Sequence, residues 1–208
     1  MALDRQRIVA EAVELLDIDG LDGVTLRKLA SRLGVQAPTL YWHLPNKAAL
    51  ITAIAEAILD QQFPTLVPPA YDRPWQEWLA ALAARLRRAL LAHPDGARVV
   101  AAAQMSLKMA AISELAMSTL VTRGLPLAHA RLTVLAVARF TIGFVLEEQS
   151  PPPDPEAAGF DLATYTEMFP TVVAGVAEYF QPGRTADDLF HDCVTLIING
   201  RPDSTHAR

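Results

Sequence analysis

Apolar residues recur every three to four positions along most of the chain, which is the spacing of one face of an α-helix. Ile8, Ala12 and Leu15 mark the first such face, and the two glycines of the segment 17–23 end it. The composition is rich in Ala and Leu, and few segments alternate apolar and polar residues. The pattern therefore predicts an all-α fold.

Two short helices follow the first. Thr25 can cap a helix over 26–33, and Gly34 suits the left-handed residue through which the chain leaves it. A third helix is predicted over 38–44, a segment that begins with proline and is followed by proline. Two short helices joined by a tight glycine turn form the helix-turn-helix arrangement. On spacing alone, an ordinary helical hairpin stays an equal alternative.

The rest of the chain is also helical in pattern. Further helices are predicted over 47–63, 75–93, 94–124 (as one helix or two), 125–149, 162–180 and 185–200, with a proline-rich loop at 150–160 and a frayed tail at 201–208. The predicted organisation is a three-helix head (1–46), a connecting helix (47–63), a proline-rich linker (64–73) and a helical ligand-binding and dimerisation core (74–208). The segment 125–149 is apolar almost all round, which indicates a helix that is buried or shared with a partner chain.

Composition narrows the classes of protein. Hydrophobic residues make up 51% of 208 residues, yet no apolar run reaches the ~18 residues that a membrane span needs. The first residues lack a signal-peptide pattern, and the single cysteine, Cys193, excludes an internal disulfide. No HExxH, GxSxG or phosphate-binding glycine loop occurs. We expect a soluble cytoplasmic protein that is not an enzyme and takes no metal or cofactor.

Charge is distributed unevenly. The net charge is −5, but no acid occurs from Gly23 to Ala55, and four Lys or Arg residues lie between Arg27 and Lys47. Local charge governs contact with phosphates within a Debye length of ~8 Å, so the stretch is typical of a DNA-binding surface. Arg27 can reach a guanine with two hydrogen bonds, worth ~1–3 kcal/mol of discrimination. Four merely solvated cations would be the plainer interpretation of the charge alone.

An aromatic cluster favours DNA binding. Tyr41, Trp42 and His43 are consecutive and therefore point in three directions from a short helix. We expect Trp42 to anchor the helix in the core and the other two to be partly exposed. Their polar ends, with the Thr39 hydroxyl and the Lys47 ammonium, can then bind phosphates or base edges. The start of the helix over 47–63 would also attract a phosphate.

These residues carry a family resemblance. "GLDGVTLRKLASRLGVQAPTLYWHLPNKAAL" resembles the DNA-binding domain of the TetR family of repressors, specifically its tetracycline-repressor branch, in which "TLYWHxxNK" is a specific motif. "WQEWLAALAARLRRALLAHPDGARVV" and "RFTIGFVLEEQ" are similar to later helices of that branch, and the likeness weakens after Ser150. The resemblance implies an all-α homodimer with a three-helix head, a core that holds a small-molecule inducer, and a four-helix bundle between subunits.

The resemblance also implies which residues contact DNA. The family's base and phosphate contacts correspond here to Arg27, Pro38, Thr39, Tyr41, His43 and Lys47. Gln36 and Ala37 open the recognition helix, and they and Leu26 depart from the tetracycline repressors. Since these positions help to choose bases, we expect a different operator sequence.

The residues predicted to bind the ligand depart further from those of the tetracycline repressors. In tetracycline repressors, histidines with an amide and an arginine hold a drug–magnesium complex, and the matching positions here are Phe63, Leu82, Val100, Gln104 and Arg139. A hard cation needs oxygen ligands, so the expected effector is a larger, less polar molecule bound without metal, not tetracycline–magnesium. The pocket is predicted to be lined by Leu82, Leu86, Val100, Ala103, Met105 and Met109. At any single position, an ordinary core role is the simpler interpretation.

Arg139 leaves two alternatives open. A cation within an apolar helix needs a partner, and it either holds a polar group of the ligand or pairs with Glu147 or Glu148 across a dimer. Without a metal, the two glutamates themselves are expected to be a solvated helix end.

The function that these features predict is a ligand-responsive repressor that binds a palindromic operator as a homodimer. A ligand in the core would change the spacing of the two heads, with the helix over 47–63 as the lever. Repression, as opposed to activation, follows from the resemblance alone. The alternative is a helical small-molecule-binding protein or enzyme that keeps the fold without binding DNA.

Overall fold

The computed structural model describes residues 3–103, 105–151 and 161–200, and all regular elements in these ranges are helices. The predicted tail at 201–208 and most of the predicted loop at 150–160 lie outside the described residues. In chain order the helices are α1 (Arg5–Gly23), α2 (Leu26–Leu33), α3 (Ala37–Tyr41), α4 (Lys47–Gln62), α5 (Trp75–Leu91), α6 (Gly96–Ala102), α7 (Leu107–Thr122), α8 (Leu127–Glu148), α9 (Leu162–Met168), α10 (Pro170–Tyr179) and α11 (Ala186–Asn199). The predicted all-α class is confirmed.

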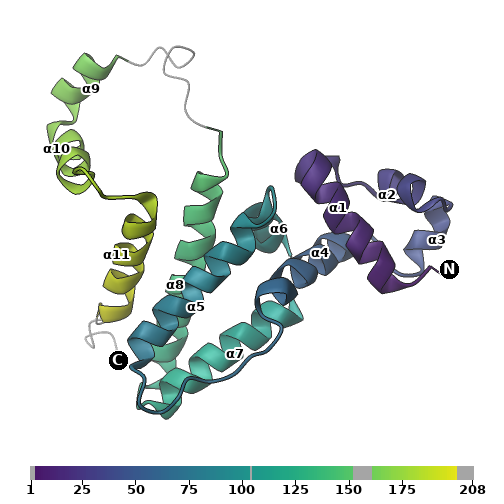
Figure 1. Ribbon diagram of the computed structural model, residues 1–208, viewed down its shortest axis with the longest axis horizontal. Coiled ribbons are helices and arrows are strands. Elements are labelled where there is room, and N and C mark those ends of the chain that lie inside the picture. Colours follow the sequence, from purple (N-terminus) through teal and green to yellow (C-terminus); the bar gives the residue numbers. More distant parts are fainter. Residues whose placement is uncertain (1–2, 104, 152–160, 201–208) are drawn as a thin grey trace, which may run out of the picture.

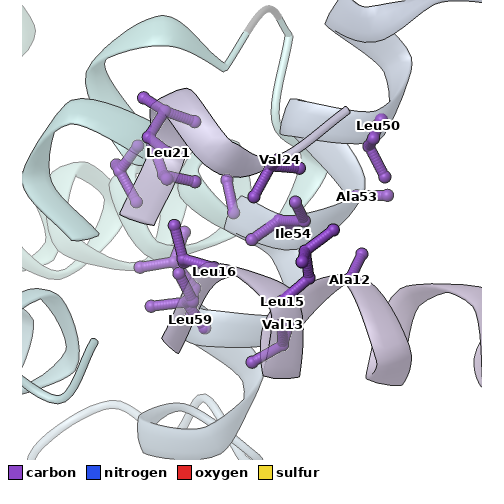
Figure 2. Close-up of a cluster of buried hydrophobic side chains, with 14 of the residues drawn as sticks. Ala12, Val13, Leu15, Leu16, Leu21, Val24, Leu50, Ala53, Ile54 and Leu59 are labelled. Carbon is purple, nitrogen blue, oxygen red and sulfur yellow. The ribbon is translucent and has the colours of Figure 1, made fainter. Parts of the chain in front are cut away.

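The head lies at one end of the molecule, where α1 packs against α4, α2 packs against α1, and α3 packs against α2 (Figure 1). Figure 2 shows how its core forms, with Leu15 and Leu16 of α1 pointing toward Ile54 and Leu59 of α4. All four side chains are at most 2% exposed. The i, i+3, i+4 spacing on each helix thus produces two apolar faces that bury one another.

The apolar core of the head continues into the rest of the protein. One cluster of buried side chains runs from α1–α3 along α4 to Phe63 and on to Leu90 of α5, Val100 of α6 and Val145 of α8. A second cluster lies where α5, α7, α8 and α11 meet, and includes Trp78, which is 7% exposed. Because the first cluster is continuous, α4 contacts both the head and the core along its length.

Three of the predicted helices differ from the structure by more than two residues. The helix α1 extends through the glycine-containing segment and bends at Gly20 (φ 66°, ψ 179°) instead of ending before it. The helix α3 stops at Tyr41, three residues short of the predicted end. The predicted single helix over 162–180 is two helices, which are separated at the non-helical Phe169 (φ −130°, ψ 54°), because the following Pro170 disfavours helical backbone at that position. The segment 94–124 forms two helices, one of the two forms predicted.

The helices α9 and α10 form an arm that lies away from the rest of the chain (Figure 1). Neither helix contains a buried residue. Apolar side chains on the arm are nevertheless numerous, and Met168, Val172 and Val176 are each more than half exposed. We define the arm as residues 162–180.

Candidate functional site

The helix-turn-helix is built by local signals. The Thr25 hydroxyl accepts the backbone N–H of Lys28 at 3.2 Å and caps α2. At the other end, Gly34 is left-handed (φ 68°, ψ 31°), and the N–H of Val35 donates to the carbonyl of Ala30 at 3.0 Å. A Cβ at Gly34 would meet nothing within 4 Å. Glycine is therefore favoured there by the backbone conformation and not by crowding.

The recognition helix α3 is anchored by leucines. Leu40 and Leu44 are 0% and 1% exposed, whereas Trp42 is 90% exposed. The prediction that Trp42 anchors the helix is therefore wrong. Residues 40 and 44 are four apart and share one face, and the ring two positions after Leu40 points roughly opposite. Tyr41, at 51% exposed, agrees with its prediction.

The predicted DNA-contacting side chains come from three helix starts. Arg27 lies at the start of α2, the group from 36 to 43 lies in and around α3, and Lys47 is the first residue of α4. Among the eight, those that are exposed are Arg27, Gln36, Pro38, Thr39, Tyr41 and Lys47, and those that are half-buried are Ala37 and His43. The fold thus leaves these side chains open to a partner while Leu40 and Leu44 fix the backbone.

Two of the four cations in this stretch are neutralised within the head. Lys28 pairs with Asp19 at 3.2 Å, and Arg32 pairs with Glu11 and with Glu14 of α1. The interpretation of four unopposed cations is therefore wrong. Within the described ranges, Arg27 and Lys47 form no ion pair, so they are the two free to meet a phosphate or a base.

The start of α4 has a well-formed cap. Asn46 Oδ1 accepts the N–H of Ala49 at 2.8 Å. The first N–H groups of the helix, at Lys47 and Ala48, have no intrahelical acceptor by construction, and they carry the positive end of the helix dipole. The predicted attraction of a phosphate to this point rests on that geometry.

The predicted ligand-binding residues lie mostly in one region. Phe63, Leu82, Leu86, Val100, Ala103 and Met109 all belong to, or pack against, the apolar cluster that runs from the head into the core. Leu82, Leu86 and Met109 also line a small cavity of about 30 Å³ between α5, α7 and α8, and Ser113 is the sole polar residue in its wall. The other lining residues are Leu79, Ile112, Ala116, Val134, Val137 and Ala138. We call this the central cavity.

Two predicted ligand residues, Met105 and Arg139, lie elsewhere. Met105 is 95% exposed and left-handed (φ 52°), and it borders an open groove between α1 and α4. Arg139 is exposed on α8 and forms no ion pair within the described residues. Gln104 lies outside the described residues. In the described part of the chain, no three His, Cys, Asp or Glu side chains gather in a group able to hold a metal ion.

Glu148 is engaged inside its own chain. It pairs with Arg87, whose guanidinium also pairs with Asp187 at 2.7 Å and lies over the rings of Phe144 and Phe190. The hydrogen bond to Glu148 raises the pKa of Arg87. Glu148 is thus not a solvated helix end, and Arg87 ties α5 to α8 and α11. Glu147 is exposed, as expected.

Polar contacts around His93 and Asp95 join the head and α4 to the core. His93, which is 7% exposed, contacts Asp17 of α1 at 2.7 Å and Gln61 of α4 at 3.0 Å. Nearby, Asp95 Oδ2 accepts the N–H of Leu21 at 2.9 Å, and Arg98 pairs with both Asp95 and Asp22. The bond from the Leu21 N–H, followed by that from Arg98, lowers the pKa of Asp95. We call these contacts the head–core junction.

A separate set of polar contacts joins α4 to α7. The Glu56 carboxylate accepts the Ser106 hydroxyl at 2.6 Å and the N–H of Lys108 at 3.2 Å, at the N-terminus of α7. The Lys108 ammonium in turn pairs with Asp60 and donates to the carbonyl of Phe63 at 3.0 Å. Movement of α7 would therefore be transmitted to α4, and through α4 to the head.

A helix-turn-helix head, joined through one helix to a helical core with an apolar cavity, defines a DNA-binding regulator of transcription. Residues 8–54 match the family described as bacterial regulatory proteins, tetR family, and residues 68–201 match the tetracyclin repressor-like C-terminal domain. The chain belongs to the TetR family, whose named relatives here are transcriptional repressors and not enzymes.

Individual relatives and solved structures support the assignment to this family. Tetracycline repressor protein class C of Escherichia coli is 37% identical over 199 residues, which are 95% of this chain and 90% of the relative. A possible TetR family regulator from Streptomyces coelicolor A3(2) has a similar crystal structure, with a TM-score of 0.78, 32% identity, and coverage of 94% and 97% of the two chains. The structure of BioQ with its double-stranded DNA operator has a TM-score of 0.64, 31% identity, and coverage of 76% and 93%.

Proposed function

We propose that this chain binds a palindromic operator as a homodimer and is released by a small, largely apolar effector. The observation that carries the proposal is the exposed surface around α3, where Arg27 and Lys47 form no ion pair with any described residue and Tyr41 and Trp42 are exposed. In a dimer, two such surfaces would enter successive major grooves about 34 Å apart. The likeness to a structure that contains DNA supports this assignment. Repression would then take place in the cytoplasm, where the operator lies.

Dimerisation is supported by the apolar surface that the single chain exposes. The helix α8 alone among the described helices is long and apolar enough to cross a membrane, and only 28% of its most apolar window is buried. It nevertheless packs against α5, α6, α7 and α11, as a core helix does. Its exposed Leu127 and Leu132, together with the arm, suit a second copy of the chain. We therefore assign α8 and the arm to the dimer interface.

The effector is proposed to be apolar because of what lines the central cavity. Leucine, valine, alanine, isoleucine and methionine form the wall, with one serine hydroxyl. Phe63 is fully buried under the Arg85 guanidinium, 4.5 Å from its ring centre, and Val100 is 7% exposed. Methionine adapts to irregular shapes, so Met109 suits a wall that must open for a ligand. Phe63, Leu82 and Val100, which stand at three of the positions that match the drug-contacting residues of tetracycline repressors, offer no side-chain oxygen or nitrogen to a drug–magnesium complex.

Release is proposed to follow from movement of α4. An effector that widens the central cavity would displace α7, which Glu56 and Lys108 tie to α4. A coupling of a few kcal/mol between effector and operator would suffice for a switch. The head–core junction would then determine the positions of the two heads in the operator-bound and the effector-bound dimer.

The experiment is operator binding by the full-length chain. Fluorescence anisotropy with a symmetric duplex from upstream of the gene should give a much lower Kd than a scrambled duplex at moderate salt. A set of apolar compounds should raise that Kd, and Mg²⁺ with tetracycline should not. Equal affinity for the two duplexes would show that the chain does not act at an operator.

A further inference from the structure

A second hollow, separate from the central cavity, lies between the proline-rich segment after α4 and one face of α7. Its volume is about 370 Å³. It shares no lining residue with the central cavity. Its walls are formed by Pro68, Pro69, Tyr71, Leu115, Ser118, Thr119, Thr122 and Arg123. We call this hollow the linker pocket.

Arg123 holds one wall of the linker pocket in place. Its guanidinium lies over the Tyr71 ring, 4.8 Å from the centre, and donates to the carbonyls of Tyr71 and Ala70, the latter at 2.7 Å. Both acceptors are neutral, and no carboxylate in the described part of the chain pairs with Arg123. Its charge is therefore uncompensated, and it keeps N–H donors to spare.

Thr119 adds a second donor. It is 6% exposed, and its hydroxyl is the one buried side-chain polar atom without a hydrogen-bond partner in the described residues. Nearly all buried polar groups in folded proteins are paired. The neighbouring Ser118 and Thr122 hydroxyls donate to helix carbonyls at 3.2 and 2.9 Å. Arg123, and Thr119 once its enclosed hydroxyl rotates toward the pocket, are thus the donors that remain for a ligand.

Two prolines, a tyrosine ring and a leucine form the apolar part of the wall. Pro68, Pro69 and the Tyr71 ring face the side of α7 that carries Leu115. Such surfaces suit a planar ring, and the volume lies at the small end of ligand pockets. A cation without a paired acid selects an anion. We propose that the linker pocket binds an aromatic carboxylate, with its ring against the prolines and Tyr71 and its carboxylate on Arg123 and Thr119.

Binding there would fix the segment that joins α4 to α5 against α7. It needs no opening of the central cavity, so the two ligands would bind together and would not compete. This inference is independent of operator binding, and its test contains no DNA.

The test is calorimetric titration of the full-length protein with 2-naphthoate, and with 2-naphthalenemethanol as a neutral molecule of the same shape. The acid should bind at least about tenfold more tightly than the alcohol. Thr119→Val removes the hydroxyl at constant shape and should weaken naphthoate binding about three- to tenfold. Arg123→Gln should abolish the preference for the acid. Thr133→Val, on α8 and outside the pocket wall, should leave both affinities unchanged.

Equal binding of the acid and the alcohol would overturn the proposal, as would absence of binding up to about 1 mM ligand. Arg123→Gln also removes the contacts to the proline-rich segment, so its thermal unfolding is recorded beside the titration. Thr119→Val leaves the side-chain contacts of Arg123 to the proline-rich segment in place, so the naphthoate Kd of this variant tests the proposed site by itself. An unchanged naphthoate Kd in this variant rejects the site.

Discussion

The carboxylate of Asp95 accepts the backbone N–H of Leu21 at 2.9 Å, so a residue at the start of α6 satisfies a donor at the bend of α1. Both sides of the contact use unusual backbone. Gly20 has φ 66°, and a Cβ there would lie 3.0 Å from the same carboxylate oxygen, while Asp95 itself has φ 56°. The contact therefore needs glycine at position 20 and a residue that tolerates the left-handed region at position 95.

Replacement of Asp95 should separate the loss of the bond from the strain of the backbone. Asp95→Asn keeps an acceptor and tolerates positive φ, so it should lower the free energy of unfolding by about 1 kcal/mol. Asp95→Ala loses the acceptor and is strained, so about 2–3 kcal/mol is expected. Urea denaturation measures both. Equal stability of the two variants would contradict this account of the junction.

The same carboxylate predicts a pH dependence. Its pKa in the folded protein is lowered, chiefly by the Leu21 N–H, from an unfolded value of about 3.9. Its contribution to stability is thus complete above pH ~4 and is lost as the pH falls through the lower folded pKa. The stability difference between the wild type and Asp95→Asn should shrink over that acid range. A difference that stays constant down to acid unfolding would rule out the linkage.

Lys47 and Lys28 provide a matched pair of cations on the head. Lys47→Ala should weaken binding to every DNA sequence and lower the slope of log K against log salt by about one, because one phosphate contact is lost. Lys28 pairs with Asp19, so Lys28→Ala should leave that slope nearly unchanged. Anisotropy titrations across a range of salt measure both slopes. Identical slopes for the two variants would mean that the internal pair does not withhold Lys28 from DNA.

Trp42 and Leu40 differ in burial and should differ in effect. Trp42→Ala removes a 90% exposed ring, so it should change the free energy of unfolding by less than about 0.5 kcal/mol while it weakens operator binding. Leu40→Ala creates a cavity under α3 and should cost about 2–5 kcal/mol. Thermal unfolding and operator titration of each variant test the contrast. A large loss of stability in Trp42→Ala would restore the ring to a core role.

The arm should govern assembly. Val172 and Val176 are one helical turn apart on α10 and are 52% and 55% exposed, so Val176→Glu places a charge on a face proposed to be covered by a second copy. Sedimentation should show dissociation, with helicity retained. Val67→Glu, at a position 67% exposed outside the arm, is the control and should stay dimeric. A dimeric Val176→Glu would exclude this face from the interface.

The sequence predicted those features of the head that depend on near neighbours. The caps at Thr25 and Asn46 and the turn at Gly34 are each set within a few residues, and the structure contains all three. Trp42 was placed wrongly because consecutive aromatic residues do not reveal which one faces inward. The spacing of Leu40 and Leu44 carries that information.

Features that depend on packing angles were beyond the sequence. Arg32 meets Glu11 and Glu14 only because α2 lies across α1, so a local count of charge overstated the free cations. Met105 was assigned to the pocket by its position along the chain, yet its left-handed backbone directs it outward. The contact between Asp95 and Leu21 joins residues that no local pattern links.

The unbroken apolar cluster from α1 through Phe63 to α6 has a consequence for how the protein can be divided. A fragment cut after residue 46 would expose Leu15, Leu16 and the rest of the face that α4 covers, so the head is not a portable module. Melting should occur in a single cooperative transition that includes both halves. Any chimera that uses this DNA-binding head must therefore include α4, and α4 brings with it the apolar contacts to the ligand-binding core.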